Sequence, residues 1–297
     1  MRSILAVIMA QRLRGKLAIV ALRALPKNAI SRAVGSLAAL RLPRPLLRAQ
    51  IRIFGRAVGL DFEEVRDPLD SFASFQEFFA RALRDGARPI DPAPDAFVAP
   101  CDGSWGTSGK VTDGTALQVK GRSYSVAALL GSREEALRFE GGTFATFYLA
   151  PRDYHRFHAP CSVRVTKLCY LPGTLWPVNR IGVEGVDGIF ARNERICAYM
   201  QTEAGGTLCL VAVGATSVGK VRVCFDDLTT NLRNARPEVR EYPAPGPAFE
   251  KGAEWGRFEL GSSIVALATP GLLELDGAAP GDPVRLGVRI GTLRGGT

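Results

Sequence analysis

Val218-Gly-Lys-Val-Arg-Val-Cys224 alternates apolar and polar residues, which is the pattern of a β-strand with one buried face. Three further short runs are rich in β-branched and aromatic residues and lie between Gly, Asp and Pro residues. They are Thr143-Phe-Ala-Thr-Phe-Tyr148, Val163-Arg-Val-Thr-Lys-Leu-Cys-Tyr170 and Leu208-Cys-Leu-Val-Ala-Val213. Because such runs recur from residue 97 onward, the sequence predicts a mostly antiparallel β body.

The N-terminal fifth of the chain has a different composition. Residues 1–60 contain twelve Lys and Arg residues and no Asp or Glu, so the net charge of +9 belongs wholly to this part of the 297-residue chain. Apolar runs such as Ile4-Leu-Ala-Val-Ile-Met9 alternate with these charges. This combination predicts basic amphipathic helices that lie on an anionic membrane surface.

Three different roles for the basic region fit its sequence less well. Its longest uncharged run, residues 3–11, has nine residues, whereas a membrane-spanning helix needs about twenty. A signal peptide is disfavoured because Arg12, Arg14 and Lys16 crowd the end of the apolar run. Nucleic-acid binding is disfavoured because aromatic residues that would stack on bases are nearly absent. A helical lobe that packs on the main domain stays open as the alternative.

Helix signals divide the first ninety residues. Pro26, Pro43 and Pro45 separate three helical pieces, and Ser74-Phe-Gln-Glu-Phe-Phe-Ala-Arg-Ala-Leu83 begins with a capping-box pattern of Ser74 and Glu77. The proline-rich residues 88–95 predict an extended linker. We therefore expect an α+β protein with a membrane-associating helical region, residues 1–65, and a second domain, residues 66–297, that contains the β body. Six cysteines without C-x-x-C spacing indicate reduced core thiols.

Residues capable of catalysis are few. His155 and His158 are the only histidines, Asp102 lies in the turn Ala99-Pro-Cys-Asp-Gly103, and a Gly261-Ser262 step precedes an apolar run. Asp, His and Ser together form the acyl-transfer set of carboxylate, base and nucleophile. No Gly-x-Ser-x-Gly elbow surrounds Ser262, which disfavours a hydrolase of that class. Two alternatives stay open: Asp102, His155 and His158 as zinc ligands, or Asp102 as a turn residue only.

The order of several motifs resembles that of the pyruvoyl-dependent phosphatidylserine decarboxylase family. The matching segments are Phe78 to Ile90, Asp102-Gly103, Tyr154 to Pro160, residues 172–179, 193–195 and 213–219, and Lys251 to Ser262. Two positions depart from the family pattern: Ser263 stands in place of the usual Thr, and Phe157 in place of a β-branched residue. Neither change removes a chemical group that the family uses.

The resemblance implies that the protein makes its own cofactor. Ser262 would attack the Gly261 carbonyl, with His158 as base and Asp102 orienting it, and cleavage would leave a β chain (residues 1–261) and an α chain (residues 262–297). Ser262 would become a covalent pyruvoyl group, which acts as the electron sink when phosphatidylserine loses carbon dioxide. His155 would be the acid that returns a proton to carbon. No metal is expected.

The resemblance also implies the partners. The substrate would be phosphatidylserine, converted to phosphatidylethanolamine by an enzyme bound peripherally to the cytoplasmic side of the cell membrane; no nucleic acid is expected, and assembly into a homo-oligomer is left open. Two other function classes remain as alternatives. An uncleaved, non-catalytic membrane-binding β module predicts one intact chain, and a zinc hydrolase predicts bound metal.

Overall fold

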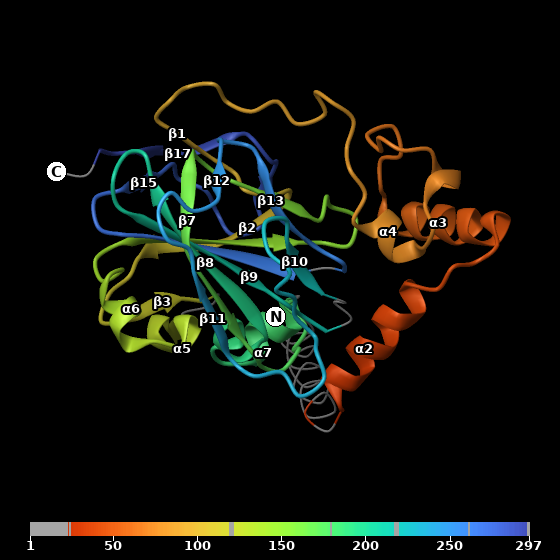
Figure 1. Cartoon of the computed structure of the whole chain (residues 1–297), viewed down its shortest axis with the longest axis horizontal. Coiled ribbons are helices and arrows are strands. Elements are labelled where there is room, and N and C mark those ends of the chain that lie inside the picture. Colours follow the sequence, from red (N-terminus) through yellow and green to blue (C-terminus); the bar gives the residue numbers. More distant parts are fainter. Residues whose placement is uncertain are drawn as a thin grey trace, which may run out of the picture.

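The computed structural model describes residues 23, 25–118, 122–178, 180–216, 220–260 and 262–295. Its N-terminal part contains helices α2 (Lys27–Ala38), α3 (Arg44–Val58) and α4 (Phe75–Phe79), which lie to one side of a β body (Figure 1). The further helices are α5 (Val126–Leu130), α6 (Arg133–Leu137), α7 (Arg180–Gly185) and α8 (Ile189–Arg192), with one 3-10 turn at Leu69–Ser71. The expected α+β class is confirmed.

One large antiparallel sheet forms the centre of the β body. Its strands run in the order β11 (Glu238–Glu241), β7 (Val163–Leu171), β8 (Arg195–Thr202), β9 (Thr207–Val213), β14 (Ser262–Ala268), β5 (Thr143–Leu149), β2 (Gly103–Lys110) and β16 (Pro283–Val284), and β12 (Ala248–Phe249) also pairs with β7. The expected strands at 143–148, 163–170 and 208–213 are thus confirmed as β5, β7 and β9.

Smaller sheets complete the body. They are β10 (Val221–Val223) with β13 (Glu254–Phe258) and β6 (Arg156–His158); β1 (Ala96–Val98) with β17 (Arg289–Leu293) and β15 (Leu273–Leu275); and β3 (Thr115–Leu117) with β4 (Ser123–Ser125). The strand expected at 218–224 corresponds to β10, although residues 217–219 lie outside the described part of the chain.

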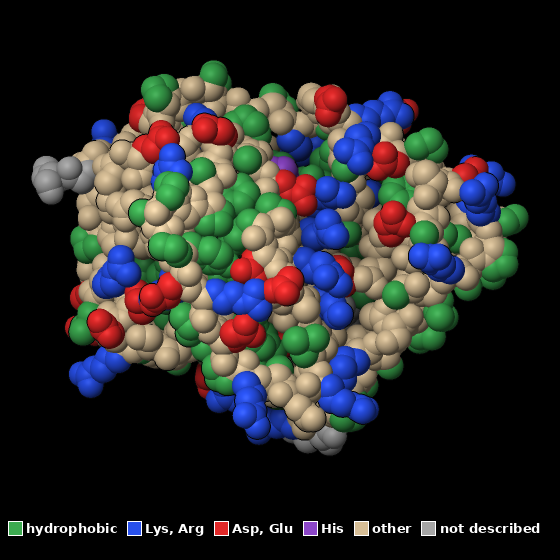
Figure 2. Space-filling view, in the orientation of Figure 1, with side chains coloured by type: hydrophobic (Ala, Val, Ile, Leu, Met, Phe, Trp, Pro, Cys, Tyr) green, Lys and Arg blue, Asp and Glu red, His purple; other side chains and the backbone are tan. Residues whose placement is uncertain are grey.

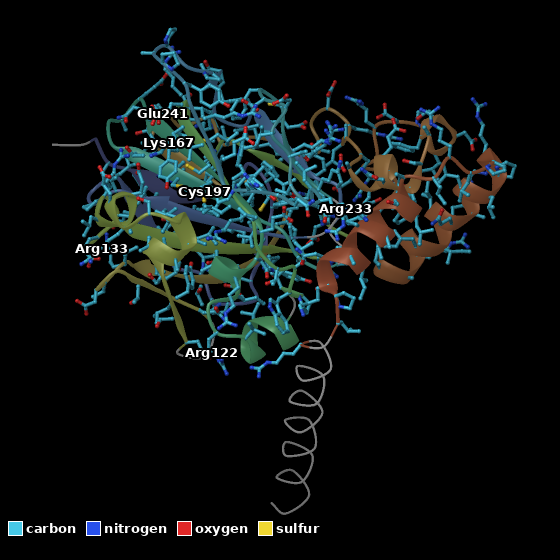
Figure 3. All side chains as sticks on the ribbon, turned by 60° about the horizontal axis from the view of Figure 1, so that its bottom comes forward. Arg122, Arg133, Lys167, Cys197, Arg233 and Glu241 are labelled. Carbon is cyan, nitrogen blue, oxygen red and sulfur yellow. The ribbon has the colours of Figure 1, made fainter. Side chains whose placement is uncertain are left out.

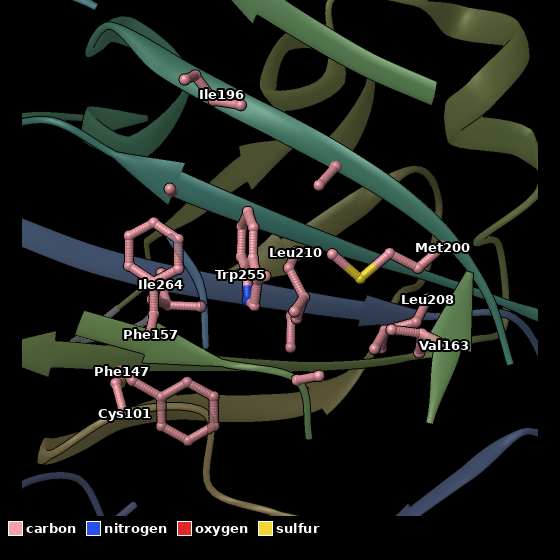
Figure 4. Packing of buried hydrophobic residues seen from close by; sticks show 14 of the residues in the cluster. Cys101, Phe147, Phe157, Val163, Ile196, Met200, Leu208, Leu210, Trp255 and Ile264 are labelled. Atoms are coloured by element: carbon pink, nitrogen blue, oxygen red, sulfur yellow. The ribbon is translucent and has the colours of Figure 1, made fainter. Parts of the chain in front are cut away.

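The central sheet separates two hydrophobic cores. Successive side chains of a strand point to opposite faces, so Ile264 and Ala266 of β14 enter one core while Val265 and Leu267 enter the other. The first core contains Trp255, Phe157 and the neighbouring side chains in Figure 4. The second is covered by helices α5 to α8. All seven residues of β14 are buried, so this strand holds its first residue, Ser262, rigidly.

The N-terminal helices begin where their prolines predict. Pro26 directly precedes α2, and Pro45 occupies the first turn of α3, where its missing N–H leaves no donor unsatisfied. The first of the three expected helical pieces lies outside the described residues. None of the helices in the described ranges combines the length and the apolar character that a membrane span requires.

The helix expected at 74–83 is shorter in the structure. Ser74 caps α4 by accepting a hydrogen bond from Glu77 N at 3.2 Å, but the helix ends at Phe79 because Leu83 pairs with Val65 in an isolated β-bridge. The Glu77 carboxylate accepts from Ala73 N rather than from Ser74 N, so the reciprocal half of the capping box is displaced by one residue.

The three helices pack as a lobe that contacts the β body. Leu47 and Ile51 of α3 share a core with Phe72 and Phe78, which lie beyond residue 66. A second small cluster joins Ala38 of α2 and Phe79 of α4 to Leu260. The residue two positions before Ser262 is therefore held by the helical lobe. The six cysteines are free, as expected, and five are buried; Cys224 is the exception, being exposed.

Candidate active site

The candidate nucleophile lies at the start of the central strand β14. Ser262 is directly opposite Leu149 of β5, and Ser263 pairs with both Tyr148 and Val213. The Ser262 side chain is buried, and its Oγ has no hydrogen-bond partner among the described residues. A buried hydroxyl without a partner is rare and unfavourable, which is typical of a reactive group. Gly261 lies outside the described residues.

The two histidines lie on the segment that follows β5. The backbone carbonyl of His155 accepts a hydrogen bond from Phe258 N at 2.8 Å, and His158 N donates to Pro100 O at 2.7 Å. These bonds bring the histidine segment between the strand that leads to Ser262 and the turn that contains Asp102. The structure therefore brings all four predicted residues to one end of the large sheet, although no hydrogen bond joins their side chains within the described part of the chain.

His158 is held as a neutral imidazole. Its Nδ1 lies 2.8 Å from the Gly252 carbonyl oxygen, so Nδ1 carries the proton and donates it. Nε2 is then the free acceptor, and the Tyr154 hydroxyl donates to it at 3.3 Å. Burial lowers the pKa of His158 below the ordinary value of a histidine, while the negative charges of Glu254 and Asp102 act in the opposite direction. The imidazole is therefore neutral near pH 7.

The groups that form hydrogen bonds with Asp102 differ from the histidine partner that the sequence predicts. Both of its carboxylate oxygens accept from Arg88 Nε, at 2.9 and 3.0 Å, and Oδ1 also accepts from Leu286 N at 2.9 Å. Arg88 pairs at the same time with Glu64. Neither ring nitrogen of His158 is bonded to Asp102, since Nδ1 is taken by the Gly252 carbonyl. The orienting bond expected from Asp102 thus comes from Gly252, and Asp102 contributes charge.

His155 is fully buried against the helical lobe. Its ring centroid lies 4.3 Å from that of Phe79, and Nδ1 donates to the Asp153 carbonyl at 2.8 Å. Nε2 has no partner among the described residues. Burial, and to a lesser degree the charge of Arg81, lowers the pKa of His155 to about 3, although the bond to Asp153 opposes this shift. In the precursor this Nε2 is therefore an unprotonated acceptor.

A zinc site is not formed by these residues. Within the described ranges, no three His, Cys, Asp or Glu side chains come together as metal ligands. Asp102, His155 and His158, which the sequence offered as a possible ligand set, each have the separate partners given above.

Sequence reasoning missed three residues of this site. Arg88 forms an ion pair with Asp102, Arg81 lies beside His155, and Tyr154 donates to His158. The signal was present, because both arginines belong to the Phe78 to Ile90 motif and Tyr154 begins the histidine motif.

Comparisons with known proteins agree with the motif order. The family model described as phosphatidylserine decarboxylase matches residues 75–292. A phosphatidylserine decarboxylase proenzyme from Anaeromyxobacter sp. (strain K) is 48% identical over 279 residues, covering 93% of this chain and 98% of that protein. Proenzymes of the same name from Brevibacillus brevis and Myxococcus xanthus are 42% and 39% identical, over 90% and 92% of this chain and 95% and 96% of their own lengths.

Proposed function

The chain belongs to the phosphatidylserine decarboxylase family, and from this premise we propose that it is a proenzyme that cleaves itself between Gly261 and Ser262 and then decarboxylates phosphatidylserine to phosphatidylethanolamine. The enzyme is a carboxy-lyase of phospholipid biosynthesis, and its cofactor is a pyruvoyl group formed from its own serine. The buried, unpartnered Oγ of Ser262 at the start of β14 is the observation that carries the assignment of this serine. The family assignment leaves no support for a zinc hydrolase or for an uncleaved binding module.

Self-cleavage requires a base, because a serine hydroxyl is a weak nucleophile at its ordinary pKa. We assign this role to Nε2 of His158, which is left unprotonated by the bond between Nδ1 and Gly252. As Oγ attacks the Gly261 carbonyl, His158 takes the hydroxyl proton, and the fixed negative charge of Asp102 favours the resulting imidazolium. Tyr154 donates to the same nitrogen, so this hydrogen bond must break before His158 takes the proton.

Decarboxylation uses the second histidine. The pyruvoyl group, once formed at Ser262, supplies the electron sink for loss of carbon dioxide. The carbon that loses carbon dioxide must receive a proton. We assign the delivery of this proton to Nε2 of His155, which is buried and has no partner among the described residues. His155 is thus proposed as the acid of the second half of the reaction.

Replacement of Ser262 by Ala tests the cofactor assignment. The variant is expected to fold, to stay a single chain and to release no carbon dioxide from radiolabelled phosphatidylserine, because only the nucleophilic oxygen is lost. Ser263→Ala is the matched control, since the adjacent hydroxyl is buried to the same extent. A Ser262→Ala protein that still decarboxylates would remove Ser262 from the mechanism.

The helical lobe supports peripheral binding to a membrane surface, which we propose is the cytoplasmic side of the cell membrane. Leu37 of α2 and Ile53 of α3 expose 65% and 69% of their surface. Helix α3 also carries four basic residues, Arg44, Arg48, Arg52 and Arg56. Each Lys or Arg near an anionic surface contributes on the order of 1 kcal/mol of attraction. Residues 1–65 are therefore proposed as the membrane-associating region.

Point substitutions test this membrane binding better than a truncation does. Removal of α2 would expose the buried side chain of Leu260, which packs against that helix. Leu37→Glu with Ile53→Glu is expected to reduce co-sedimentation with anionic vesicles and to leave self-cleavage intact. Leu137→Glu is the matched control, since Leu137 is 67% exposed on α6 at the other side of the body. Equal vesicle binding by the parent, the Leu37→Glu with Ile53→Glu variant and Leu137→Glu would show that the lobe has a structural role only.

A further inference from the structure

Three arginines lie directly opposite one another across the small sheet of β10, β13 and β6. Arg257 of β13 pairs in register with Arg222 of β10 and with Arg156 of β6, so the three side chains share one face. Like charges directly opposite destabilise a sheet. Arg222 pairs with Glu259, and Arg156 pairs with Glu254. Arg257, which lies between them, has no carboxylate partner among the described residues.

Two of these three arginines line a cavity of about 470 Å³ between the helical lobe and the sheet. Its lining includes Arg156 and Arg257 from the row and Arg41, Arg66 and Arg81 from the lobe and the segment that follows it. Figure 2 shows Lys and Arg side chains gathered in a column along this boundary, with a histidine surface near its upper end.

The carboxylates of the lining already have donors. Asp67 pairs with Arg66, Glu77 accepts from Ala73 N, and Glu259 pairs with Arg222. Arg41, like Arg257, has no carboxylate partner in the described part of the chain. The cavity therefore presents positive charge that the protein itself does not neutralise.

Arg81 connects the cavity to the reaction centre. It is 3% exposed, and its Nε has no partner among the described residues. One of its terminal nitrogens donates to the Asp153 carbonyl at 3.3 Å, and this same carbonyl accepts from Nδ1 of His155. An anion bound at Arg81 would thus lie beside the histidine that serves decarboxylation.

We propose that this cavity binds the phosphodiester of the lipid headgroup, with Arg257 as its principal ligand; this rests on the proposed function. Arginine presents a planar fork of donors that matches a phosphate in two hydrogen bonds. The substrate carboxylate is excluded as the ligand by the chemistry. It must leave as neutral carbon dioxide, so a guanidinium bound to it would stabilise the ground state more than the transition state.

The phosphodiester keeps its charge throughout the reaction, so its binding is equal in the ground and transition states. Removing such an interaction raises KM and leaves kcat nearly unchanged. For Arg257→Met we expect KM for phosphatidylserine in mixed micelles to rise about 10- to 100-fold, since a hydrogen bond to a charged group is lost. The KM of Arg257→Lys is expected to lie between those of the parent and of Arg257→Met, because lysine keeps the positive charge but lacks the planar pair of donors.

Two readouts separate ligand binding from a structural role. Arg257→Met is expected to cleave itself as the parent does and to melt at an equal or higher temperature, because like-charge repulsion in the row is relieved. Arg133→Met on α6, far from the helical lobe (Figure 3), is the matched control and is expected to keep the parent KM. Competitive inhibition by glycerophosphoserine and by inorganic phosphate is expected to weaken in Arg257→Met; for glycerophosphoserine the loss should match the rise in KM.

An unchanged KM in cleaved Arg257→Met would overturn the proposal. So would weaker binding of this variant to phosphatidylglycerol vesicles together with unchanged inhibition by glycerophosphoserine, because the row would then contact the membrane rather than the substrate. If the parent protein releases no carbon dioxide, the proposed function fails separately. In that case, calorimetry measures the affinity for glycerophosphoserine of uncut Ser262→Ala and of the double variant Ser262→Ala with Arg257→Met. Equal affinities of the two proteins would reject the phosphodiester site, and a lower affinity of the double variant would support it.

Discussion

Replacement of Asp102 by Asn separates the structural from the catalytic contribution of this carboxylate. The amide keeps an oxygen that can accept from Leu286 N, but it loses the charge that faces Arg88. Removing one partner of a buried ion pair typically lowers the free energy of unfolding by about 3–5 kcal/mol. Arg88 retains Glu64 as a second partner, so we expect a smaller loss of about 2–3 kcal/mol.

The same substitution should slow self-cleavage. Asp102 favours the protonated form of His158, although less than Glu254 does, so its loss leaves His158 a weaker base. We therefore expect cleavage to be slower than in the parent. Urea unfolding in the uncut Ser262→Ala background measures stability, and a time course of freshly synthesised precursor on a denaturing gel measures cleavage.

Asp95→Asn is the matched control for both assays, because Asp95 pairs with Arg289 at the surface. An exposed pair contributes at most about 1 kcal/mol, so this variant should differ little from the parent. If Asp102→Asn loses stability but cleaves at the parental rate, the carboxylate is a structural group only. If the free energy of unfolding of Asp102→Asn is unchanged, the ion pair between Asp102 and Arg88 does not stabilise the fold as we infer.

Three further predictions concern the histidines. His158→Ala should slow precursor cleavage about 10²- to 10⁴-fold, leaving slow residual cutting over days on a gel; parental cutting would exclude it as the base. His155→Ala should cut at least partly yet turn over poorly, and parental turnover by its cleaved form would remove it from decarboxylation. In uncut protein, the pKa of His155 is about 3 in the folded state against the ordinary 6.5 in the unfolded state, because burial disfavours the charged imidazole. The folded protein therefore keeps its full stability above pH 6.5 and loses stability as the pH falls from 6.5 towards 3. The free energy of unfolding should then drop by about 1.4 kcal/mol per pH unit, about 2 kcal/mol by pH 5; a His155→Gln variant with the same slope would contradict this.

Local pattern was sufficient for much of the fold. The strands β5, β7 and β9 follow from β-branched runs bounded by turn residues, and the starts of α2 and α3 follow from their prolines. The early end of α4 could not be predicted, because it depends on the bridge between Val65 and Leu83, which tertiary contacts create.

The members of the candidate site could be proposed from the sequence, but their contacts could not. Motif order pointed to Asp102, His155, His158 and Ser262, yet no local pattern indicates that Arg88 would take the Asp102 carboxylate. The orienting acceptor of His158 is a backbone carbonyl at Gly252, which any residue could supply, so its sequence carries no signal. The arginine row likewise depends on strand register, which only the assembled sheet defines.

The intact masses of the purified protein show whether the chain cleaves itself and at which bond. Self-cleavage at Gly261-Ser262 predicts two chains, residues 1–261 and 262–297, the smaller beginning with a pyruvoyl group and therefore lacking a free N-terminal amine. Active protein with the mass of one uncut chain, or with a break at any other bond, would contradict the account.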